Sequence, residues 1–453
     1  MAQTDELIVS VSGIRGIVGR GLTPAAALSF AQALANTVGG KPVVVCRDGR
    51  PSGAMLRHAV VAGLQAGGCT VHDLGIQPTP TCGLAVRQLQ AAGGIQITAS
   101  HNPAPWNGLK LFGADGAVLT AAQGQLIQER YLAGGFRCAA WNELGLEASV
   151  PQAADWHRER VLELVNVEGI RKLKPVVLVD ANGGAGGPLA LRLLADLGCQ
   201  TVGIACDSDG VFRHEAEPTA ENLTTICPQV PSAKAAIGFV LDPDADRLAL
   251  IDQNGSYIGE ELTLALALAY RLMHEPGAVV VNMSTSRVSE DIATRSKSAF
   301  HRSAVGEANV VEKMRAVGAV LGGEGNGGVI DPRVGWVRDP FIAMGLILSY
   351  MAETGKSLSA LVSDLPAYTI IKDKYQVDRA GLPQLFQALQ TRWPEAKADK
   401  VDGLRLDWSD RWVHVRPSNT EPIVRVIAEA PKAEAARELC RAVGEALTGG
   451  RSD

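Results

Sequence analysis

Short runs of β-branched residues alternate along this chain with glycine-rich turns and with helical stretches rich in alanine and leucine. This order occurs three times, and the copies begin with the apolar runs at residues 41–45, 174–178 and 278–282. A turn and a predicted helix follow each run, at residues 54–65, near 189–197 and from about 289 onwards. The first two copies continue into second predicted strands, at residues 67–71 and 198–202. Strand, turn and helix in alternation predict parallel βαβ units, so we expect three related α/β domains in tandem.

The pattern changes beyond about residue 368. Short strands are predicted at residues 375–377, 403–408, 412–415 and 423–428, with helices at 383–391 and 433–447. Closely spaced strands of this kind are typical of an antiparallel sheet. The predicted fold class is therefore α/β, with three tandem related α/β domains that have mixed, largely parallel sheets, and a C-terminal α+β domain. Changes of pattern place these domains at residues 1–150, 151–252, 253–367 and 368–453.

Composition narrows the class of protein. Of 453 residues, 46% are hydrophobic and 20% charged, which excludes a wholly disordered chain. A net charge of −5 argues against a nucleic-acid partner. The eight cysteines show no C-x-x-C spacing, which favours reduced thiols. The longest apolar stretches, residues 262–273 and 341–351, are shorter than the roughly 20 residues of a membrane span. With no secretory signal visible, we expect a cytoplasmic protein of buried helices without a membrane partner.

A serine-containing turn follows the apolar strand predicted at residues 94–98. The segment reads Thr-Ala-Ser-His-Asn-Pro over residues 98–103, and it exposes the hydroxyl of Ser100 beside polar groups. Ser100 is a candidate nucleophile, with His101 and the downstream Lys110 supplying proton transfer or positive charge. The alternative is a serine that only caps the turn before Pro103.

Three carboxylates follow another apolar strand, at residues 238–241. Asp242, Asp244 and Asp246 are spaced two residues apart, and ligation by oxygen alone favours Mg²⁺, Mn²⁺ or Ca²⁺ over zinc. The ends of strands are where α/β sheets build their sites. A solvated acidic turn capped by Arg247 is the alternative interpretation.

Three further loops, at residues 12–16, 322–328 and 416–422, carry groups that can bind hydroxyls or phosphate. An isolated glycine-rich turn and a hairpin loop are the alternative interpretations of the second and third of them. Glycines at residues 322–328 free the backbone for a ligand, and Glu324 and Asn326 offer hydrogen bonds to hydroxyls. The segment Arg-Pro-Ser-Asn-Thr-Glu-Pro at 416–422 combines a guanidinium, hydroxyls and an amide, which suits a dianion. Arg15, between two short glycine turns, is a second candidate phosphate ligand. A nucleophile, a cation site and phosphate ligands are together what phosphoryl transfer needs.

Five segments resemble the signature loops of the α-D-phosphohexomutases, in the order of that family and over essentially the whole chain. They are residues 12–16, 98–103, 242–247, 323–327 and 416–422. The resemblance implies four domains around a central cleft, and an enzyme that interconverts hexose 1-phosphate and hexose 6-phosphate. It implies a phosphoserine at Ser100, one Mg²⁺ held by Asp242, Asp244, Asp246 and a serine phosphate oxygen, and hexose 1,6-bisphosphate as intermediate and activator.

The resemblance also implies roles for individual residues. The implied catalytic residues are Arg15, Ser100, His101 and Lys110. The implied substrate-binding residues are Arg247, Glu307, Glu324, Asn326, Arg416, Ser418, Asn419, Thr420 and Arg425.

The departures from the family pattern bear on the sugar. Many members end the sugar loop in Ser-Gly-His, whereas this chain has Asn-Gly-Gly at 326–328. Glu307 stands where some phosphomannomutases carry histidine, which is similar to phosphoglucosamine mutases. An acidic side chain there would suit an aminosugar cation, so we expect glucosamine phosphate to be preferred, ahead of mannose and glucose phosphates. A phosphatase that uses phosphoserine, or a non-catalytic sugar-phosphate sensor, is the alternative class. The chain is expected to be a monomer or a homodimer.

Overall fold

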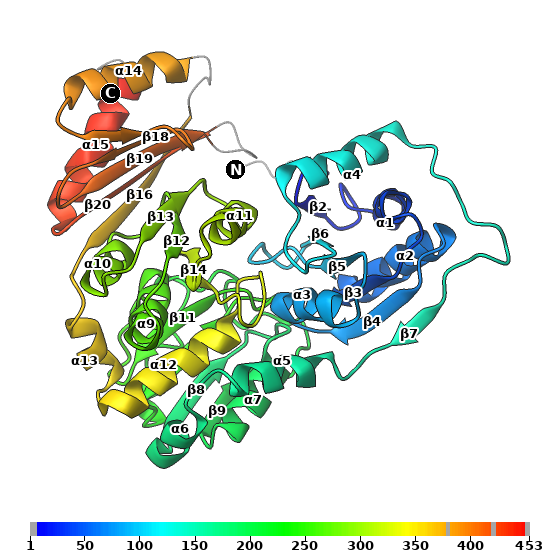
Figure 1. Ribbon diagram of the computed structural model, residues 1–453, viewed down its shortest axis with the longest axis horizontal. Helices are drawn as coiled ribbons and strands as arrows, with labels where there is room; N and C mark the ends of the chain where they lie inside the picture. The colour runs from blue at the N-terminus through cyan, green and yellow to red at the C-terminus, as the bar shows by residue number, and fades with distance from the viewer. Residues whose placement is uncertain (1–6, 377–380, 418–422, 449–453) are drawn as a thin grey trace.

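The computed structural model describes residues 7–376, 381–417 and 423–448. Within them, the chain forms four β-sheets, each drawn from its own stretch of sequence and covered by helices (Figure 1). This arrangement confirms the predicted fold class of three α/β units followed by an α+β unit. The strands of the four sheets fall within the four predicted domain ranges, while the exact boundaries stay a prediction.

The first sheet has seven strands in the order β1-β2-β6-β5-β3-β4-β7. They are β1 (Ile8–Ser10), β2 (Gly13–Ile17), β3 (Val43–Arg47), β4 (Val71–Ile76), β5 (Gly93–Ile97), β6 (Trp106–Gly113) and β7 (Glu147–Ser149). The helices are α1 (Pro24–Val38), α2 (Ser52–Ala66), α3 (Thr79–Gln88) and α4 (Ala121–Ala133). Strands β5, β3, β4 and β7 run parallel, and β6, β2 and β1 extend the sheet antiparallel. The mixed sheet places the end of β5 beside the antiparallel strand β6.

The second and third sheets share one plan, in which three parallel strands carry one antiparallel strand at an edge. Their orders are β11-β10-β8-β9 and β13-β12-β14-β15. The strands are β8 (Val176–Asp180), β9 (Gln200–Ile204), β10 (Ile237–Leu241), β11 (Leu248–Asp252), β12 (Val279–Asn282), β13 (Phe300–Ser303), β14 (Leu321–Glu324) and β15 (Gly328–Ile330). The helices are α5 (Ala153–Leu162), α6 (Val167–Leu173), α7 (Gly187–Asp196), α8 (Gln229–Ser232), α9 (Glu260–His274), α10 (Val288–Arg295), α11 (Glu307–Val317), α12 (Pro340–Thr354) and α13 (Leu358–Ser363). The repeated plan explains the repeated sequence pattern.

A single hydrophobic core joins the second and third units. It contains Leu193 of α7, Phe239 of β10, Leu266 of α9 and Ile347 of α12, each at most 1% exposed. Helix α12 is buried on nearly every side, which confirms the prediction that its apolar run is a buried helix. No helix among the described residues is both long and apolar enough to cross a membrane. The core makes these two units one body that holds their loops in fixed relation.

The fourth sheet is antiparallel, in the order β16-β20-β19-β18-β17. Its elements are β16 (Thr369–Gln376), α14 (Leu382–Arg392), β17 (Lys397–Asp399), β18 (Leu404–Asp407), β19 (Trp412–Pro417), β20 (Ile423–Ala430) and α15 (Ala433–Thr448). Both helices pack on the face that carries Val413, Val415 and Val426. Alternate residues lie on the other face, and His414 there meets Ser284 Oγ of the third unit at 3.0 Å. A polar contact therefore links the C-terminal sheet to the third unit.

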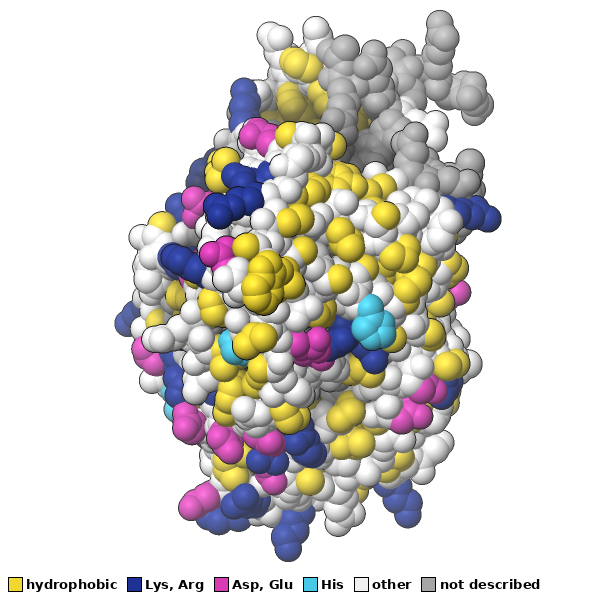
Figure 2. Space-filling model, turned by 90° about the vertical axis from the view of Figure 1, so that its right-hand side faces the viewer, with side chains coloured by type: hydrophobic (Ala, Val, Ile, Leu, Met, Phe, Trp, Pro, Cys, Tyr) yellow, Lys and Arg dark blue, Asp and Glu magenta, His cyan; other side chains and the backbone are white. Residues whose placement is uncertain are grey.

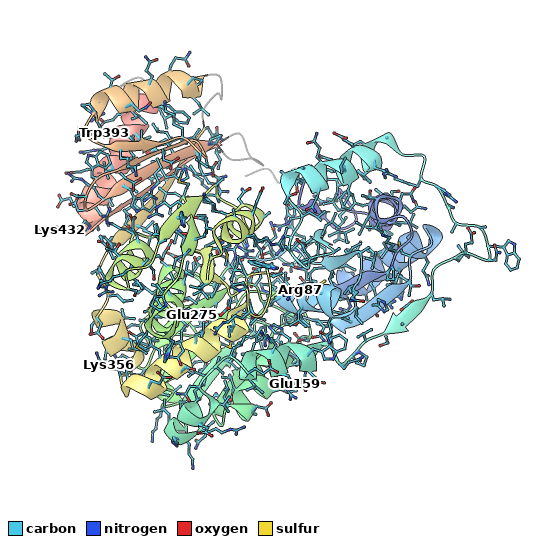
Figure 3. All side chains as sticks on the ribbon, in the orientation of Figure 1. Arg87, Glu159, Glu275, Lys356, Trp393 and Lys432 are labelled. Atoms are coloured by element: carbon cyan, nitrogen blue, oxygen red, sulfur yellow. The ribbon has the colours of Figure 1, made fainter. Side chains whose placement is uncertain are left out.

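Polar contacts also join the first and third units. Arg87 at the end of α3 donates to the carbonyl of Val334 at 3.2 Å, in the segment that leads into α12 (Figure 3). Arg315 of α11 pairs with Asp115 in the turn after β6. On the face drawn in Figure 2, Lys and Arg side chains are interspersed with Asp and Glu and form no continuous basic stripe. The contacts between units bring together loops that lie far apart in the sequence.

Element boundaries differ from the prediction where the signal was weak. The strand expected at residues 67–71 begins at Val71 instead, because Gly67 and Gly68 turn the chain after α2, with Gly68 at a φ of +85°. The short strands β7 and β17 were not predicted. Both lie at sheet edges, and no residue in either is buried, so they carry no hydrophobic pattern.

Candidate active site

The serine loop follows β5 directly and turns back into β6. Ser100 has a φ of +52°, in the left-handed region that costs a non-glycine residue about 1–2 kcal/mol. Its side chain is almost fully buried, so the prediction of an exposed hydroxyl is wrong. The hydroxyl Oγ lies 3.2 Å from Nδ1 of His101 and 3.3 Å from Oδ2 of Asp242 in the second unit. The strained serine therefore places one hydroxyl between an imidazole and a carboxylate.

Arg50 holds the serine loop in this conformation. It is 1% exposed, and its Nε donates to Asp48 at 3.0 Å. The remaining donors of its guanidinium reach four carbonyls at 2.6–3.2 Å, those of Ser100, Asn102, Pro103 and Trp106. All five N–H groups of the Arg50 guanidinium thus donate to Asp48 or to carbonyls between Ser100 and Trp106. Arg50 could not be predicted from the sequence, because a lone arginine in a polar turn is common.

The three predicted metal-ligating carboxylates converge after β10. Asp242, Asp244 and Asp246 are all 0% exposed, and one oxygen from each lies within 4.8 Å of the others. The turn is tight because Oδ1 of Asp242 accepts the N–H groups of Asp246 and Arg247 at 3.0 and 3.1 Å. Ala245 between them has a φ of +51°. The backbone of this turn is bent so that all three side chains meet at one place.

The donor set fits a hard divalent cation. Oδ1 of Asp244 and Oδ1 of Asp246 are buried and have no hydrogen-bond partner among the described residues. Burial and repulsion from Asp244 and Asp246 raise the pKa of Asp242 well above its ordinary value. Three adjacent buried carboxylates need positive charge, and oxygen ligands without sulfur or imidazole favour Mg²⁺ or Mn²⁺. The three residues could therefore hold such an ion.

Lys110 of β6 reaches the same carboxylates from the first unit. Its Nζ lies 2.6 Å from Oδ2 of Asp246 and 3.7 Å from Oε2 of Glu307. Burial alone would lower the pKa of Lys110, but the carboxylates of Asp246, Glu307 and Asp244 raise it. Lys110 therefore stays protonated at neutral pH and places a positive charge beside these carboxylates.

Arg338 is a second buried cation beside these carboxylates, and it was not predicted from the sequence. Its Nη2 lies 2.6 Å from Asp246, its Nη1 lies 2.8 Å from Glu324, and its Nε lies 3.5 Å from Glu307. Burial opposes its charge, but these three carboxylates raise the pKa of Arg338 well above its ordinary value. The available signal was its position just before Asp339 and Pro340, which begin the buried helix α12.

The predicted sugar-binding residues Glu324 and Asn326 lie in the loop next to Arg338 and its other carboxylate partners. Oε1 of Glu324 accepts from Asn282 at 2.9 Å and from the Gly306 N–H at 3.0 Å, and Oε2 accepts from Arg338. Glu324 thus fixes the loop in which Glu307 begins α11. Oδ1 of Asn326 is buried without a hydrogen-bond partner among the described residues, so it offers an acceptor. The sugar-binding roles of these residues stay predictions.

Two arginines lie close enough to His101, the residue after Ser100, to act on its charge. Arg15 of β2 donates to Oδ1 of Asn102 in the serine loop at 3.4 Å. Arg247 lies near Oε1 of Glu217 at 3.6 Å. The charge of Arg247, burial and the charge of Arg15 together lower the pKa of His101 to about 2. The His101 imidazole is therefore neutral at neutral pH, and the same positive charges make it a weak base.

The predicted phosphate ligands lie in the C-terminal unit, and the structure describes part of them. Arg416 at the end of β19 forms an ion pair with Asp402 at 3.2 Å. Arg425 of β20 is its register partner across the sheet. Ser418, Asn419 and Thr420 lie outside the described residues. The two arginines therefore lie at the same end of the sheet.

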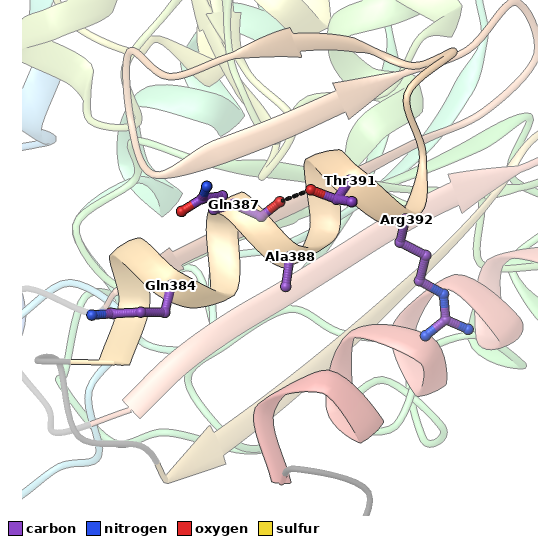
Figure 4. A pocket seen from close by; sticks show the side chains of 5 residues that line it. All are labelled: Gln384, Gln387, Ala388, Thr391 and Arg392. Carbon is purple, nitrogen blue, oxygen red and sulfur yellow. Dashed lines mark hydrogen bonds between the residues drawn. The ribbon is translucent and has the colours of Figure 1, made fainter.

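A hollow on the outer surface of the C-terminal unit belongs to a different place. Its lining residues come from α14 alone, and they are Gln384, Gln387, Ala388, Thr391 and Arg392 (Figure 4). Thr391 Oγ1 is already bonded to the carbonyl of Gln387 at 3.0 Å. This hollow contains none of the predicted site residues.

Each of the four units matches a model of a known protein family, and the matches follow the order of the chain. Family models described as phosphoglucomutase/phosphomannomutase, alpha/beta/alpha domains I, II and III, match residues 7–137, 156–255 and 259–368. The model of the phosphoglucomutase/phosphomannomutase C-terminal domain matches residues 376–446. The four matches follow one another along the chain without overlap.

Relatives and a solved structure match over nearly the full length. A probable phosphoglucosamine mutase of Methanopyrus kandleri is 36% identical over 94% of this chain and 95% of its own. A phosphoglucomutase/phosphomannomutase of Thermococcus kodakarensis is 37% identical with the same coverage. The crystal structure of a phosphoglucomutase/phosphomannomutase family protein from Burkholderia thailandensis superposes with a TM-score of 0.86 at 29% identity, covering 98% of this chain and 99% of that one. With four domains matched in order and a serine loop that meets a buried aspartate triad, the chain belongs to the phosphoglucomutase/phosphomannomutase family of phosphohexomutases, which are intramolecular phosphotransferases of the isomerase class.

Proposed function

We propose that this enzyme interconverts the 1-phosphate and 6-phosphate of a hexose through a phosphoserine at Ser100 and a hexose 1,6-bisphosphate, with glucosamine phosphate as the preferred substrate. The observation that carries the mechanism is the position of the Ser100 hydroxyl, 3.3 Å from one carboxylate of a buried aspartate triad and 3.2 Å from a neutral imidazole. A nucleophile next to a cation site is the arrangement that phosphoryl transfer requires.

Each group near Ser100 has one task in this proposal. In one half-reaction the bond from Oγ of Ser100 to phosphorus breaks as a sugar oxygen bonds to phosphorus, and the proton of the sugar hydroxyl passes through the His101 imidazole to Oγ of Ser100. In the reverse half-reaction the bond from the sugar oxygen to phosphorus breaks as Ser100 Oγ bonds to phosphorus, and the proton of Ser100 passes through the His101 imidazole, which lies within hydrogen-bonding reach, to the sugar oxygen. Lys110, Arg15 and Arg247 supply fixed positive charge to phosphate oxygens. Bound Mg²⁺, held by Asp242, Asp244, Asp246 and a phosphate oxygen, would supply Lewis-acid stabilisation.

Substrate retention belongs to the same proposal. The bisphosphate must present its second phosphate to the same serine, so a phosphate site away from the cation has to hold either end. Arg416, Arg425 and the segment 418–420 are the proposed ligands, because guanidinium and hydroxyl donors recognise a dianion rather than a particular sugar. Hexose 1,6-bisphosphate is accordingly expected to activate enzyme whose Ser100 carries no phosphate. A reducing, cytoplasmic setting is part of the proposal, and the eight free thiols support it.

Phosphorus NMR tests the reaction directly. Incubation of the enzyme with glucosamine 1-phosphate, Mg²⁺ and a trace of the bisphosphate is expected to convert the 1-phosphate signal into that of the 6-phosphate. Addition of a chelator in excess over the metal should stop the conversion, because three buried carboxylates hold the required ion. The release of inorganic phosphate instead would indicate a phosphatase and would overturn the mutase proposal for this substrate.

Sugar preference is expected to follow the acidic character of the sugar site. Glu307 and Glu324 are both largely buried beside the cluster, and an ammonium group at the sugar C2 position would gain from their negative charge. We therefore expect a higher kcat/KM for glucosamine phosphate than for mannose phosphate. The name of the Methanopyrus kandleri relative supports this order, and that of the Thermococcus kodakarensis relative supports the alternative of mannose and glucose phosphates.

A matched variant shows whether the charge of Glu307 sets this preference. Oε1 of Glu307 accepts the backbone N–H of Arg338 at 2.9 Å. Glu307→Gln keeps an oxygen that can accept this hydrogen bond and removes the negative charge. The ratio of kcat/KM for glucosamine phosphate to that for mannose phosphate should be closer to one in this variant. A wild-type preference for mannose phosphate above about tenfold, roughly 1.4 kcal/mol in transition-state binding, would contradict the proposed substrate and leave the mutase reaction intact.

A further inference from the structure

Each carboxylate of the aspartate triad receives one side-chain donor from the first unit. Ser100 Oγ approaches Asp242 at 3.3 Å, and Lys110 Nζ approaches Asp246 at 2.6 Å. The third donor is Thr79, at the start of α3, whose Oγ1 donates to Oδ2 of Asp244 at 2.7 Å. This is the shortest of the hydroxyl contacts to the triad. Thr79 is not one of the predicted site residues, and the reaction as proposed assigns it no task.

Thr79 holds Asp244 at both of its ends. Besides the side-chain bond, the Thr79 N–H donates to the Asp244 carbonyl at 2.9 Å. Both residues are 0% exposed, so neither bond competes with solvent. A carboxylate held at its backbone and at one oxygen cannot rotate freely about its Cβ–Cγ bond. Its other oxygen, Oδ1, is then fixed in place, and it is the buried atom without a hydrogen-bond partner among the described residues.

We propose that Thr79 is a positioning residue that orients Asp244 for the divalent cation, so that the first unit sets the metal affinity of a loop in the second. The inference rests on the proposed function, since it takes the triad as the cation site. Groups that hydrogen-bond to metal ligands fix the orientation of those ligands, and their loss commonly weakens metal binding by about 10- to 100-fold. Thr79 meets the conditions for such a group because its hydroxyl is buried, close and directed at a single carboxylate oxygen.

The variant Thr79→Val removes the hydroxyl and leaves the rest of the contact. Valine has nearly the shape of threonine and retains the N–H that bonds the Asp244 carbonyl. Mn²⁺ serves as the probe, because its free form is counted by electron paramagnetic resonance in a titration of the full-length protein. We expect Thr79→Val to bind Mn²⁺ at least tenfold more weakly than wild type. Thr79→Ser, which keeps the hydroxyl, should bind within about twofold of wild type.

Thr81 provides the matched control on the same helix. It is equally buried, but its Oγ1 bonds to Nδ1 of His157 at 2.9 Å and not to the aspartate loop. Thr81→Val is therefore expected to lower stability without changing Mn²⁺ affinity. Intact-mass measurement ensures that the proteins compared carry the same amount of phosphate on Ser100. Loss of affinity in both variants would show a general effect of loosening α3 and would overturn the specific role of Thr79.

The outcomes separate this inference from the function on which it rests. If wild type binds Mn²⁺ and Thr79→Val binds it equally well, Thr79 does not orient Asp244, and the cation site stands. If wild type binds no Mn²⁺ at millimolar concentration, the proposed cation site is wrong, and the inference is overturned with it. Weak binding by Thr79→Val, together with rescue by Thr79→Ser and unchanged binding by Thr81→Val, supports the proposal.

Discussion

Replacement of Ser100 by alanine is expected to lower mutase turnover by at least three orders of magnitude while the fold survives. Ser100 Oγ is the hydroxyl that the structure places beside both the aspartate triad and a neutral imidazole. The loop around it is held by the guanidinium of Arg50, through the backbone carbonyls of Ser100 and its neighbours, and those bonds do not need the Ser100 side chain. Steady-state kinetics with hexose 1-phosphate measures the loss. Intact mass should show a phosphate increment on wild type that the variant lacks.

Ser100→Gly separates chemistry from conformation. Glycine adopts a φ of +52° without the steric cost that a Cβ imposes, so this variant should unfold at a denaturant concentration at least as high as Ser100→Ala. Both variants should nevertheless be equally inactive. If either variant retained turnover within about tenfold of wild type, the phosphoryl carrier would not be Ser100. A fall in turnover confined to the less stable of the two would instead indicate a structural effect.

The repeated architecture could be predicted from the sequence because buried parallel strands read as uninterrupted apolar runs. Strand β8 has the sequence VVLVD, and four of its five residues are buried. The same reasoning fails for edge strands such as β17, whose residues Lys397–Asp399 have the sequence Lys-Ala-Asp and are not buried. Their strand conformation comes from pairing with β18, which is a tertiary cause that no local pattern reports.

The site could be predicted where its residues are contiguous. The segments 98–103 and 242–247 each contain several chemical groups within six residues, and the structure places Ser100 and Asp242 of these segments in contact across the first and second units. Arg50, Thr79 and Arg338 are single residues in segments without a recognisable motif, and their contacts join positions up to 165 residues apart in the sequence. Contacts between residues so far apart cannot be predicted from a single sequence, because the distance between two residues along the chain does not show whether they meet in the fold.

The charged cluster at the centre of the site shows how the units are joined. Lys110 comes from the first unit, Asp246 from the second, and Arg338 with its partner Glu324 from the third. Because these side chains are buried, each charge is stabilised by its oppositely charged partner. Removal of one partner leaves the other buried and unpaired, which is strongly unfavourable. The chemistry and the assembly of three units therefore depend on one set of ion pairs.

The removal of Arg338 is expected to cause the largest loss of stability among substitutions near the site. Arg338→Met leaves Asp246, Glu307 and Glu324 buried with one cation fewer, and the loss of one partner of a buried ion pair costs about 3–5 kcal/mol. Urea denaturation measures this as a lower unfolding midpoint. Activity should fall as well, because Glu324 and Asp246 lose the guanidinium that fixes them. Arg338→Lys should recover part of the stability and less of the activity, since an ammonium cannot bond two carboxylates in the planar geometry of a guanidinium.

Arg315 supplies the control for Arg338→Met, because it also joins two units by an ion pair. Its partner is Asp115, and their side chains are 37% and 43% exposed. Exposed pairs contribute about 0–1 kcal/mol, so Arg315→Met should shift the urea midpoint little and leave kcat/KM near that of wild type. Equal destabilisation by the two variants would mean that the joining of units, and not the burial of charge, determines the cost. A shift for Arg338→Met no larger than the one expected for Arg315→Met would contradict the view that this cluster holds the three units together around the site.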